Sequence, residues 1–180
     1  KYPNVKPINE LHAMNFSCIV DMPVEIGISN ILKMKTFNAG GLTDYEEKAK
    51  VAAQAMGTEN AIYVHLKGPD EFGHDGDAIG KMKNIEEIDK RFFGTLLDHI
   101  DVSKVAVMIS ADHSTPSIHK GHSADPVPVR AARDGALLLL DHRERVARHA
   151  VAARPVLAKR HPHLRSPFVM CTDMIRTAVY

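Results

Sequence analysis

Two short stretches of the sequence concentrate the side chains that could do chemistry. Residues 70–77 read DEFGHDGD, and residues 112–125 read DHSTPSIHKGHSAD. Carboxylate oxygens combined with imidazole nitrogens suit Mn²⁺ or Zn²⁺, whereas sites made only of oxygen suit Mg²⁺ or Ca²⁺ better. Asp, Gly, His and Ser are also common in solvated loops, so one stretch alone would favour a polar loop. Two such stretches favour a metal site if the fold brings them together.

The spacing within each stretch allows its side chains to converge. Asp70 and His74 are four residues apart, so one helical turn or a compact loop can aim both at one point. Asp112 and His113 are adjacent, and His122 follows nine residues later in a loop that can return. Several carboxylates in one place would repel one another unless a cation neutralised them. Two metals about 3.5–4 Å apart would clamp the attacking and leaving oxygens of a phosphoryl transfer.

The elements that must position these residues alternate between strands and helices. Short apolar runs predict buried strands at 15–22, 61–67 and 105–111. Helical spacing of apolar residues predicts helices at 24–34, 43–56 and 78–100. In the second of these helices Thr43 is the expected N-cap and Glu46 would complete a capping box. In the third, Ile79 and Met82 begin the face expected to pack on the core.

This order of elements predicts an α/β protein, a three-layer α/β/α arrangement with a largely parallel sheet. Parallel sheets gather ligands beyond the carboxyl ends of their strands. The first polar stretch follows the strand at 61–67 after a short turn, and the second follows the strand at 105–111 directly. We therefore expect the two stretches at the same edge of the sheet, as two walls of one site.

The composition is that of an ordinary globular domain. The chain has 180 residues, of which 44% are hydrophobic and 25% charged, and its net charge of +1 argues against a nucleic-acid-binding protein. No apolar run approaches the roughly 20 residues that cross a bilayer, and no signal-peptide core is present, so no membrane contact is expected. Cys18 and Cys171 are expected as buried free thiols rather than a disulfide, which fits the cytoplasm.

The charge balance changes abruptly after residue 128. Residues 1–128 contain twelve lysines, one arginine and 18 acidic residues, whereas residues 129–180 contain one lysine, nine arginines and four acidic residues. We therefore divide the chain into residues 1–129, which carry the candidate metal site, and an arginine-rich tail at 130–180. The tail is either a diverged genuine end or a segment from a shifted reading frame or a foreign sequence.

Four motifs together resemble the archaeal-type 2,3-bisphosphoglycerate-independent phosphoglycerate mutases of the alkaline phosphatase superfamily. They are VHLKGPDEFGHDGD (64–77), EEIDK (86–90), ISADHSTP (109–116) and HSADPVPV (122–129). The resemblance covers roughly residues 12–129 and implies the alkaline-phosphatase-like fold, incomplete in this chain because family members are about twice as long. It therefore implies that residues 1–129 are a partial metalloenzyme domain.

The resemblance implies a role for each residue of the two stretches. Asp70 and His74 resemble the pair that binds one divalent metal, with His122 completing its protein ligands. Asp112 and His113 resemble the pair on a second metal. Two divalent ions are thus implied, Mn²⁺ or Zn²⁺, with Mg²⁺ and Co²⁺ as alternatives.

The family's nucleophile has no counterpart in this chain. In the family, the second metal also takes an aspartate and the nucleophilic serine, both from near the N-terminus of the full protein. Ser114 and Ser123 lie in motifs that match the metal loops instead, so we assign no catalytic residue here. This chain alone is expected to show little or no mutase activity.

The implied function is metal-dependent interconversion of 3-phosphoglycerate and 2-phosphoglycerate through a phosphoserine, in glycolysis and gluconeogenesis. The partner would be a small phosphorylated substrate, and the sequence leaves the oligomeric state open. One rival is another enzyme of the superfamily, a phosphatase or phosphonate hydrolase. A rival of a different class is an inactive metal-binding fragment.

Several other polar residues near the site have plainer interpretations. His65 is expected as a packed histidine and His119 as an exposed one. Lys67 and Lys81 could meet a substrate, although a surface lysine is the commoner role. Asp77 could orient a ligand from outside or cap the following helix.

Overall fold

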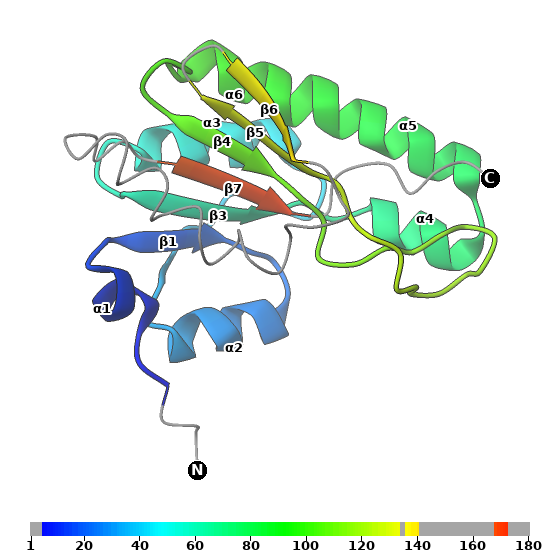
Figure 1. Ribbon diagram of the computed structural model, residues 1–180, viewed down its shortest axis with the longest axis horizontal. Coiled ribbons are helices and arrows are strands. Elements are labelled where there is room, and N and C mark those ends of the chain that lie inside the picture. The colour runs from blue at the N-terminus through cyan, green and yellow to red at the C-terminus, as the bar shows by residue number, and fades with distance from the viewer. Residues whose placement is uncertain (1–4, 134–135, 141–167, 173–180) are drawn as a thin grey trace.

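The computed structural model describes residues 5–133, 136–140 and 168–172 (Figure 1). The helical elements are α1 (Ile8–His12), α2 (Pro23–Ile31), α3 (Tyr45–Ala55), α4 (Pro69–Asp75), α5 (Ala78–Ile88), the π-helical turn η1 (Asp89–Phe93) and α6 (Gly94–His99). The strands are β1 (Phe16–Ile19), β2 (Lys35–Thr36), β3 (Ala61–His65), β4 (Ala106–Ile109), β5 (Val129–Arg133), β6 (Ala136–Leu140) and β7 (Phe168–Thr172). Each strand and helix expected from the apolar spacing is therefore present, within a few residues of its predicted ends.

The strands form one sheet in the order β2-β1-β3-β7-β4-β5-β6. The pairs from β2 to β4 are parallel, and the pairs β4–β5 and β5–β6 are antiparallel. The prediction of an α/β protein with a largely parallel sheet is confirmed. Strand β7 pairs with both β3 and β4, so the two strands that precede the polar stretches are separated by one strand and point the same way.

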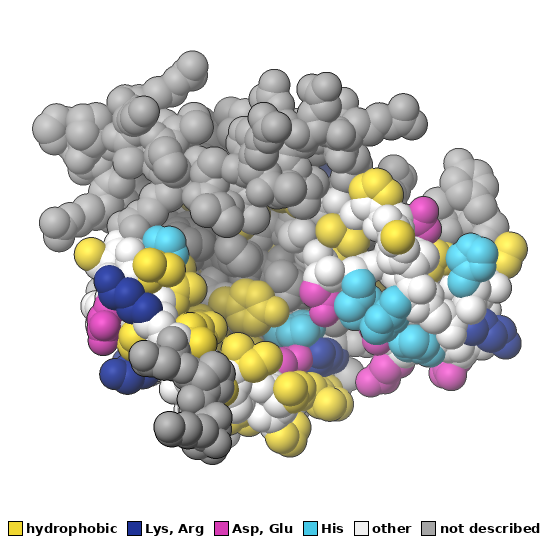
Figure 2. Space-filling view, turned by 60° about the horizontal axis from the view of Figure 1, so that its bottom comes forward, with side chains coloured by type: hydrophobic (Ala, Val, Ile, Leu, Met, Phe, Trp, Pro, Cys, Tyr) yellow, Lys and Arg dark blue, Asp and Glu magenta, His cyan; other side chains and the backbone are white. Residues whose placement is uncertain are grey.

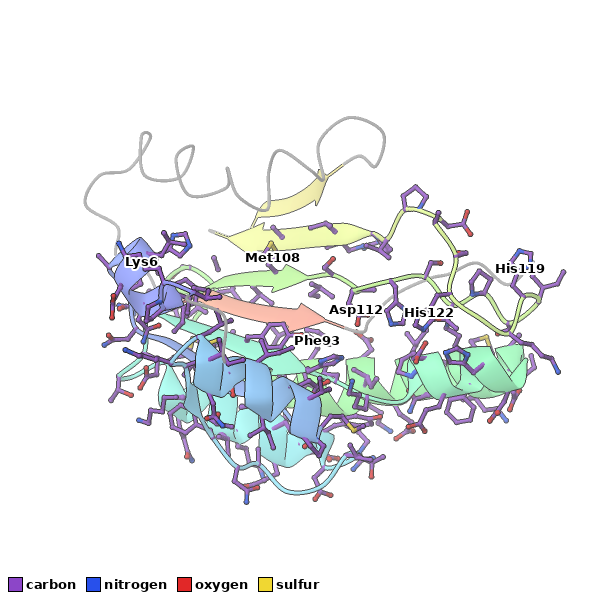
Figure 3. All side chains as sticks on the ribbon, turned by 90° about the horizontal axis from the view of Figure 1, so that it is seen from below. Lys6, Phe93, Met108, Asp112, His119 and His122 are labelled. Carbon is purple, nitrogen blue, oxygen red and sulfur yellow. The ribbon has the colours of Figure 1, made fainter. Side chains whose placement is uncertain are left out.

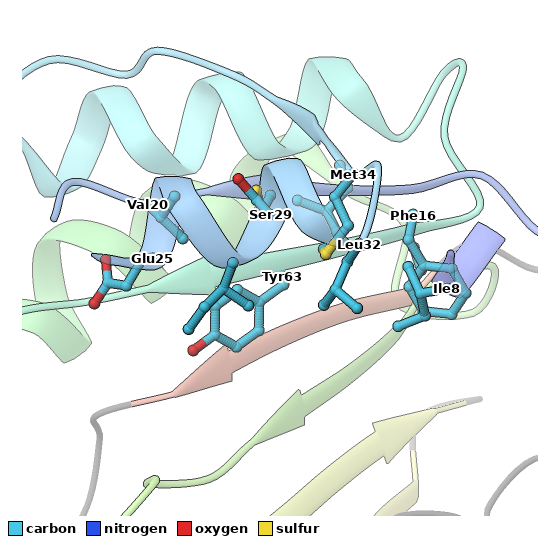
Figure 4. A pocket seen from close by; sticks show the side chains of 12 residues that line it. Ile8, Phe16, Val20, Glu25, Ser29, Leu32, Met34 and Tyr63 are labelled. Carbon is cyan, nitrogen blue, oxygen red and sulfur yellow. The ribbon is translucent and has the colours of Figure 1, made fainter. Parts of the chain in front are cut away.

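Successive strand residues point to opposite faces of the sheet, so apolar residues lie on both faces. Helices cover each of these faces. Ile19, Ile62 and Val64 lie in a core with buried residues of α3, η1 and α6. Phe16 and Cys18 lie on the other face, where they line an apolar hollow of about 280 Å³ with residues of α1 and α2 (Figure 4). The described part of the sheet around β1 and β3 thus forms the middle of an α/β/α arrangement. Cys18 is a buried free thiol, as expected.

The predicted helix at 78–100 is a continuous helical run that contains a π-turn. The wider turn at η1 buries two successive rings, Phe92 and Phe93, which pack edge to face with their centroids 5.1 Å apart. Ile79 and Met82 are exposed, so the prediction that they begin the core face was wrong. Their part of α5 packs on α4 rather than over the sheet (Figure 1), and the buried face begins further along the helix.

The predicted capping box at the start of α3 was also wrong. The helix begins at Tyr45, and Asp44 occupies the N-cap position without a side-chain cap. The Asp44 carboxylate instead accepts a hydrogen bond from the Gly41 backbone amide at 2.7 Å. The side chain of Glu46 forms a two-pronged ion pair with Arg91, at 2.6 and 2.7 Å, and so links α3 to η1.

The change of composition falls at the first residue of β5, and β5 and β6 continue the sheet beyond β4. Most of residues 130–180 lies outside the described part of the chain, so the division at residue 129 and the origin of the tail stay predictions. Within the described residues, no helix is both long and apolar enough to pass through a bilayer.

Candidate metal centre

Both polar stretches lie beyond the carboxyl ends of β3 and β4, at one edge of the sheet. Helix α4 follows β3 and carries the first stretch, and the loop at 110–128 follows β4 and carries the second. Figure 3 shows Asp112 and His122 near each other past the strand ends, with His119 further out along the same loop. The expectation that the fold would bring the two stretches together is confirmed.

Helix α4 begins with a sharp turn that aims Asp70 and His74 to one side. Gly68 has φ +128°, a conformation that side chains rarely adopt, and Pro69 provides the fixed φ that suits the first helical residue. The four-residue spacing then places both ligand candidates on one helical face. Asp70 Oδ1 and His74 Nε2 are 3.6 Å apart.

The loop after β4 folds back on itself and returns His122 to this face. The Ser123 amide donates a hydrogen bond to the Ser114 carbonyl at 2.9 Å, in an isolated antiparallel bridge. The ring of His122 consequently stacks on that of His113, with centroids 3.7 Å apart and planes inclined by 27°. Figure 2 shows histidine side chains gathered beside acidic ones on one face of the molecule.

Three of these residues have the geometry of a cation site. The atoms Asp70 Oδ1, His74 Nε2 and His122 Nε2 are separated by 3.6, 3.7 and 3.2 Å. Ligand atoms bound to a tetrahedral Zn²⁺ at about 2.0–2.2 Å lie about 3.3–3.6 Å from one another. His74 Nδ1 lies 3.3 Å from the Lys120 carbonyl, which can only accept, so this contact favours a proton on Nδ1 and leaves Nε2 able to bind a cation. The residues therefore fit a divalent metal.

Asp112 and His113 lie directly beside this trio. Asp112 Oδ2 and His113 Nε2 are 3.4 Å apart, and His113 Nδ1 is 3.9 Å from Asp70 Oδ1. All five residues expected from the sequence thus lie together, as one group of three and one adjoining pair. The pair offers one oxygen and one nitrogen, which alone is too few for a protein metal site.

Two buried residues of the site, Thr115 and Lys81, have roles that the sequence interpretation did not predict. The hydroxyl of Thr115 donates a hydrogen bond to Asp70 Oδ1 at 2.5 Å, and Lys81 Nζ donates to the Thr115 carbonyl at 2.8 Å. Both side chains are buried, so Lys81 is not a surface lysine. The threonine lies inside the DHST motif, but nothing in its type or spacing separates it from an ordinary loop residue.

A second polar cluster lies at the same end of β3, formed by Glu25, His65 and Lys67. Glu25 Oε1 is 2.9 Å from His65 Nδ1 and 2.6 Å from Lys67 Nζ. Burial alone would raise the pKa of the Glu25 carboxyl, but the hydrogen bonds from Lys67 and the Met22 amide, with the nearby positive charges, lower the pKa overall. This cluster fixes the strand exit before α4, and it makes His65 a packed histidine, as expected.

The remaining polar residues have local roles. Asp77 accepts a hydrogen bond from the Gly80 amide at 2.8 Å and so caps α5, which decides between its two interpretations. His119 is exposed, as expected.

Replacing Gly73 with alanine is expected to weaken metal binding and to lower the free energy of unfolding by about 1–3 kcal/mol, as overpacking does. A Cβ at Gly73 would lie 2.5 Å from the Thr115 carbonyl oxygen, so α4 and the loop after β4 would have to separate. Chemical denaturation and calorimetric metal titration would measure both effects.

Gly94→Ala is the matched control, because a Cβ at this helical glycine would have no neighbour within 4 Å. It should stabilise the protein by up to about 1 kcal/mol and leave metal affinity unchanged. If the two variants had the same free energy of unfolding and the same metal affinity, the close approach of α4 to the loop after β4 would contribute to neither.

Comparisons with known proteins agree with this fold. A family model described as the metalloenzyme superfamily matches residues 25–153. The 2,3-bisphosphoglycerate-independent phosphoglycerate mutase of Aeropyrum pernix is 40% identical over 136 residues, which cover 71% of this chain and 32% of that protein. The enzyme of the same name from Methanopyrus kandleri is 36% identical over 130 residues, covering 69% of this chain and 31% of that protein.

Among solved structures, the PH0037 protein from Pyrococcus horikoshii superposes with a TM-score of 0.69 at 29% identity, covering 73% of this chain and 42% of that one. This neighbour and the family match fit the alkaline-phosphatase-like fold expected from the sequence. The chain spans about one third of the length of the curated relatives it matches. Because the family model covers more than half of its residues, the chain belongs to the metalloenzyme superfamily.

Proposed function

We propose that this chain carries the metal-binding part of a cofactor-independent phosphoglycerate mutase. The reaction would interconvert 3-phosphoglycerate and 2-phosphoglycerate by way of a phosphoserine. The observation that carries the proposal is the trio Asp70, His74 and His122, whose ligand atoms all lie within 4.8 Å of one another in a chain related to enzymes of that name.

Each half of the site is assigned to one metal. Asp70, His74 and His122 would hold the first divalent ion, and Asp112 and His113 would contribute to the second. The nitrogen-rich donor set favours Mn²⁺ or Zn²⁺ over Mg²⁺, with Co²⁺ as a further alternative. When bound, the metals would lower the pKa of a hydroxyl group and stabilise the transferring phosphoryl group.

The nucleophilic serine of this mechanism is not assigned to this chain. Ser114 is buried, and the Ser123 hydroxyl donates a hydrogen bond to Asp125 Oδ2 at 2.7 Å. These contacts support the interpretation of both as loop residues. In the complete reaction the serine would accept the phosphoryl group from one hydroxyl of the glycerate and return it to the other.

The cellular role follows from this reaction. The substrate would be a small phosphorylated acid, the pathway would be glycolysis and gluconeogenesis, and the compartment would be the cytoplasm. No nucleic acid or membrane enters the proposal.

A chimera tests the function. The matching 136-residue region of the Aeropyrum pernix mutase would be replaced by the corresponding residues of this chain. We expect the chimera to convert 3-phosphoglycerate to 2-phosphoglycerate with Mn²⁺, and we expect the same chimera with His74→Ala to be inactive.

Two controls define the interpretation. This chain alone, with Mn²⁺, should not convert 3-phosphoglycerate to 2-phosphoglycerate. Conversion would contradict the proposal that the nucleophilic serine lies outside this chain. A chimera that folds by circular dichroism and binds Mn²⁺ but does not turn over would favour the inactive metal-binding fragment. If the chimera hydrolysed phosphate esters or phosphonates but had no mutase activity, the result would favour another enzyme of the superfamily, a phosphatase or phosphonate hydrolase, as the source of this chain.

A further inference from the structure

Thr115 connects the two halves of the metal centre. Its side chain is buried, with an exposed fraction of 2%. The hydroxyl oxygen lies 2.5 Å from Asp70 Oδ1, in the first group, and 3.1 Å from His113 Nδ1, in the second. A single hydroxyl thus contacts one ligand candidate from each half.

The direction of these two hydrogen bonds follows from the number of protons available. An ionised carboxylate only accepts, so the Thr115 hydroxyl must donate its one proton to Asp70. The same oxygen can then only accept from His113, so Nδ1 of that ring must carry the proton. A neutral imidazole protonated at Nδ1 has its lone pair on Nε2.

In this tautomer the nitrogen that faces Asp112, Nε2, carries no proton. His113 Nε2 lies 3.4 Å from Asp112 Oδ2, so an unprotonated nitrogen and a carboxylate oxygen face each other. Two acceptors in this position repel each other unless a cation lies between them. The opposite tautomer would place a proton on Nε2 and block it as a ligand.

The backbone of Thr115 is held from two sides, so its hydroxyl has a fixed position. Lys81 Nζ donates to its carbonyl oxygen from α5, and the absence of a Cβ at Gly73 lets α4 approach the same oxygen closely. The methyl group of Thr115 also faces Gly73, since a Cβ there would lie 3.0 Å from Thr115 Cγ2. These contacts orient the hydroxyl between its two partners.

We propose that Thr115 is a positioning residue that orients Asp70 and fixes the Nδ1–H tautomer of His113, and so prepares both metal positions together. The inference rests on the metal centre proposed above. A purely structural threonine would contribute packing and one satisfied hydrogen bond. It would leave the tautomer of His113 and the metal affinity unchanged.

The matched variants are Thr115→Val, which keeps the shape and removes the hydroxyl, and Thr115→Ser, which keeps the hydroxyl. Nuclear magnetic resonance of the ¹⁵N-labelled imidazole rings reads the tautomer in the metal-free chain, with His113→Gln used to assign the signal. We expect Nδ1–H in the wild type and in Thr115→Ser, and loss of this preference in Thr115→Val. An Nε2–H tautomer in the wild type would overturn the proposal, even if the valine variant failed to fold.

Calorimetric titration with Zn²⁺ provides the second readout. Loss of an outer partner of a metal ligand typically lowers affinity about 10–100-fold, and we expect a decrease in that range for Thr115→Val and recovery in Thr115→Ser. A folded valine variant with wild-type affinity and tautomer would contradict the proposal. If the wild type bound no Zn²⁺, the metal centre itself would fail, whereas the tautomer measurement would still report on Thr115.

Discussion

The His74→Ala variant is expected to bind Mn²⁺ or Zn²⁺ at least about 100-fold more weakly than the wild type. Loss of an outer partner already costs about 10–100-fold, and His74 offers its nitrogen directly to the cation position. Removing it leaves Asp70 and His122 as the protein donors of the first group. Calorimetric titration, or competition with a coloured chelator, would measure the affinity.

His119→Ala is the control for this variant. His119 lies in the same loop as His122 but is exposed and outside the ligand trio. Its replacement should leave the affinity within about twofold of the wild type, since surface substitutions away from such features have small effects. If both histidine variants kept wild-type affinity, the assignment of the centre would be incorrect.

The Leu96→Ala variant is expected to have a free energy of unfolding about 2–5 kcal/mol below the wild type. Leu96 has an exposed fraction of 0% and lies in the core between α6 and the sheet. Its truncation removes buried methyl groups and leaves a cavity that the surrounding side chains fill only in part. Urea denaturation followed by circular dichroism would measure the change.

The neighbouring Leu97 provides a control of identical chemistry, because its exposed fraction is 52%. Leucine and alanine have similar helix propensities, so Leu97→Ala should change the free energy of unfolding by no more than about 0.5 kcal/mol. Similar losses in the two variants would contradict the burial of this helical face.

The part of the site that the sequence predicted depends on local geometry. The four-residue spacing of Asp70 and His74 needs only one helical turn, and Asp112 and His113 need only the end of a strand. Their meeting at one sheet edge follows from the parallel order of the strands. The return of His122 required a loop whose bridge between Ser114 and Ser123 no pattern indicated.

The part that the sequence did not predict depends on contacts between distant residues. The hydrogen bond from Thr115 to Asp70 spans 45 positions, and that from Lys81 to Thr115 spans 34. A buried lysine is costly unless it finds an acceptor, and only the folded chain shows the carbonyl that provides one. Composition and periodicity therefore described Lys81 as a surface residue.

In the fold, too, the sequence predicted what local patterns determine and missed what depends on the detailed course of the chain. Apolar runs correctly predicted the strands around the site and the helix that begins at residue 78. The π-turn at η1 was not predicted, because a helical pattern does not show where one extra residue widens the turn. Thr43 failed as a cap because the helix begins later and the Asp44 carboxylate bonds to a loop amide instead.

The position of β7 has a consequence for the order in which the protein matures. This strand comes last in the described chain yet lies between β3 and β4, whose ends carry the two halves of the centre. During synthesis both halves leave the ribosome well before the strand that sets their distance. A nascent chain halted before residue 168 would therefore lack the strand that lies between β3 and β4 and holds the two halves of the candidate centre at this distance.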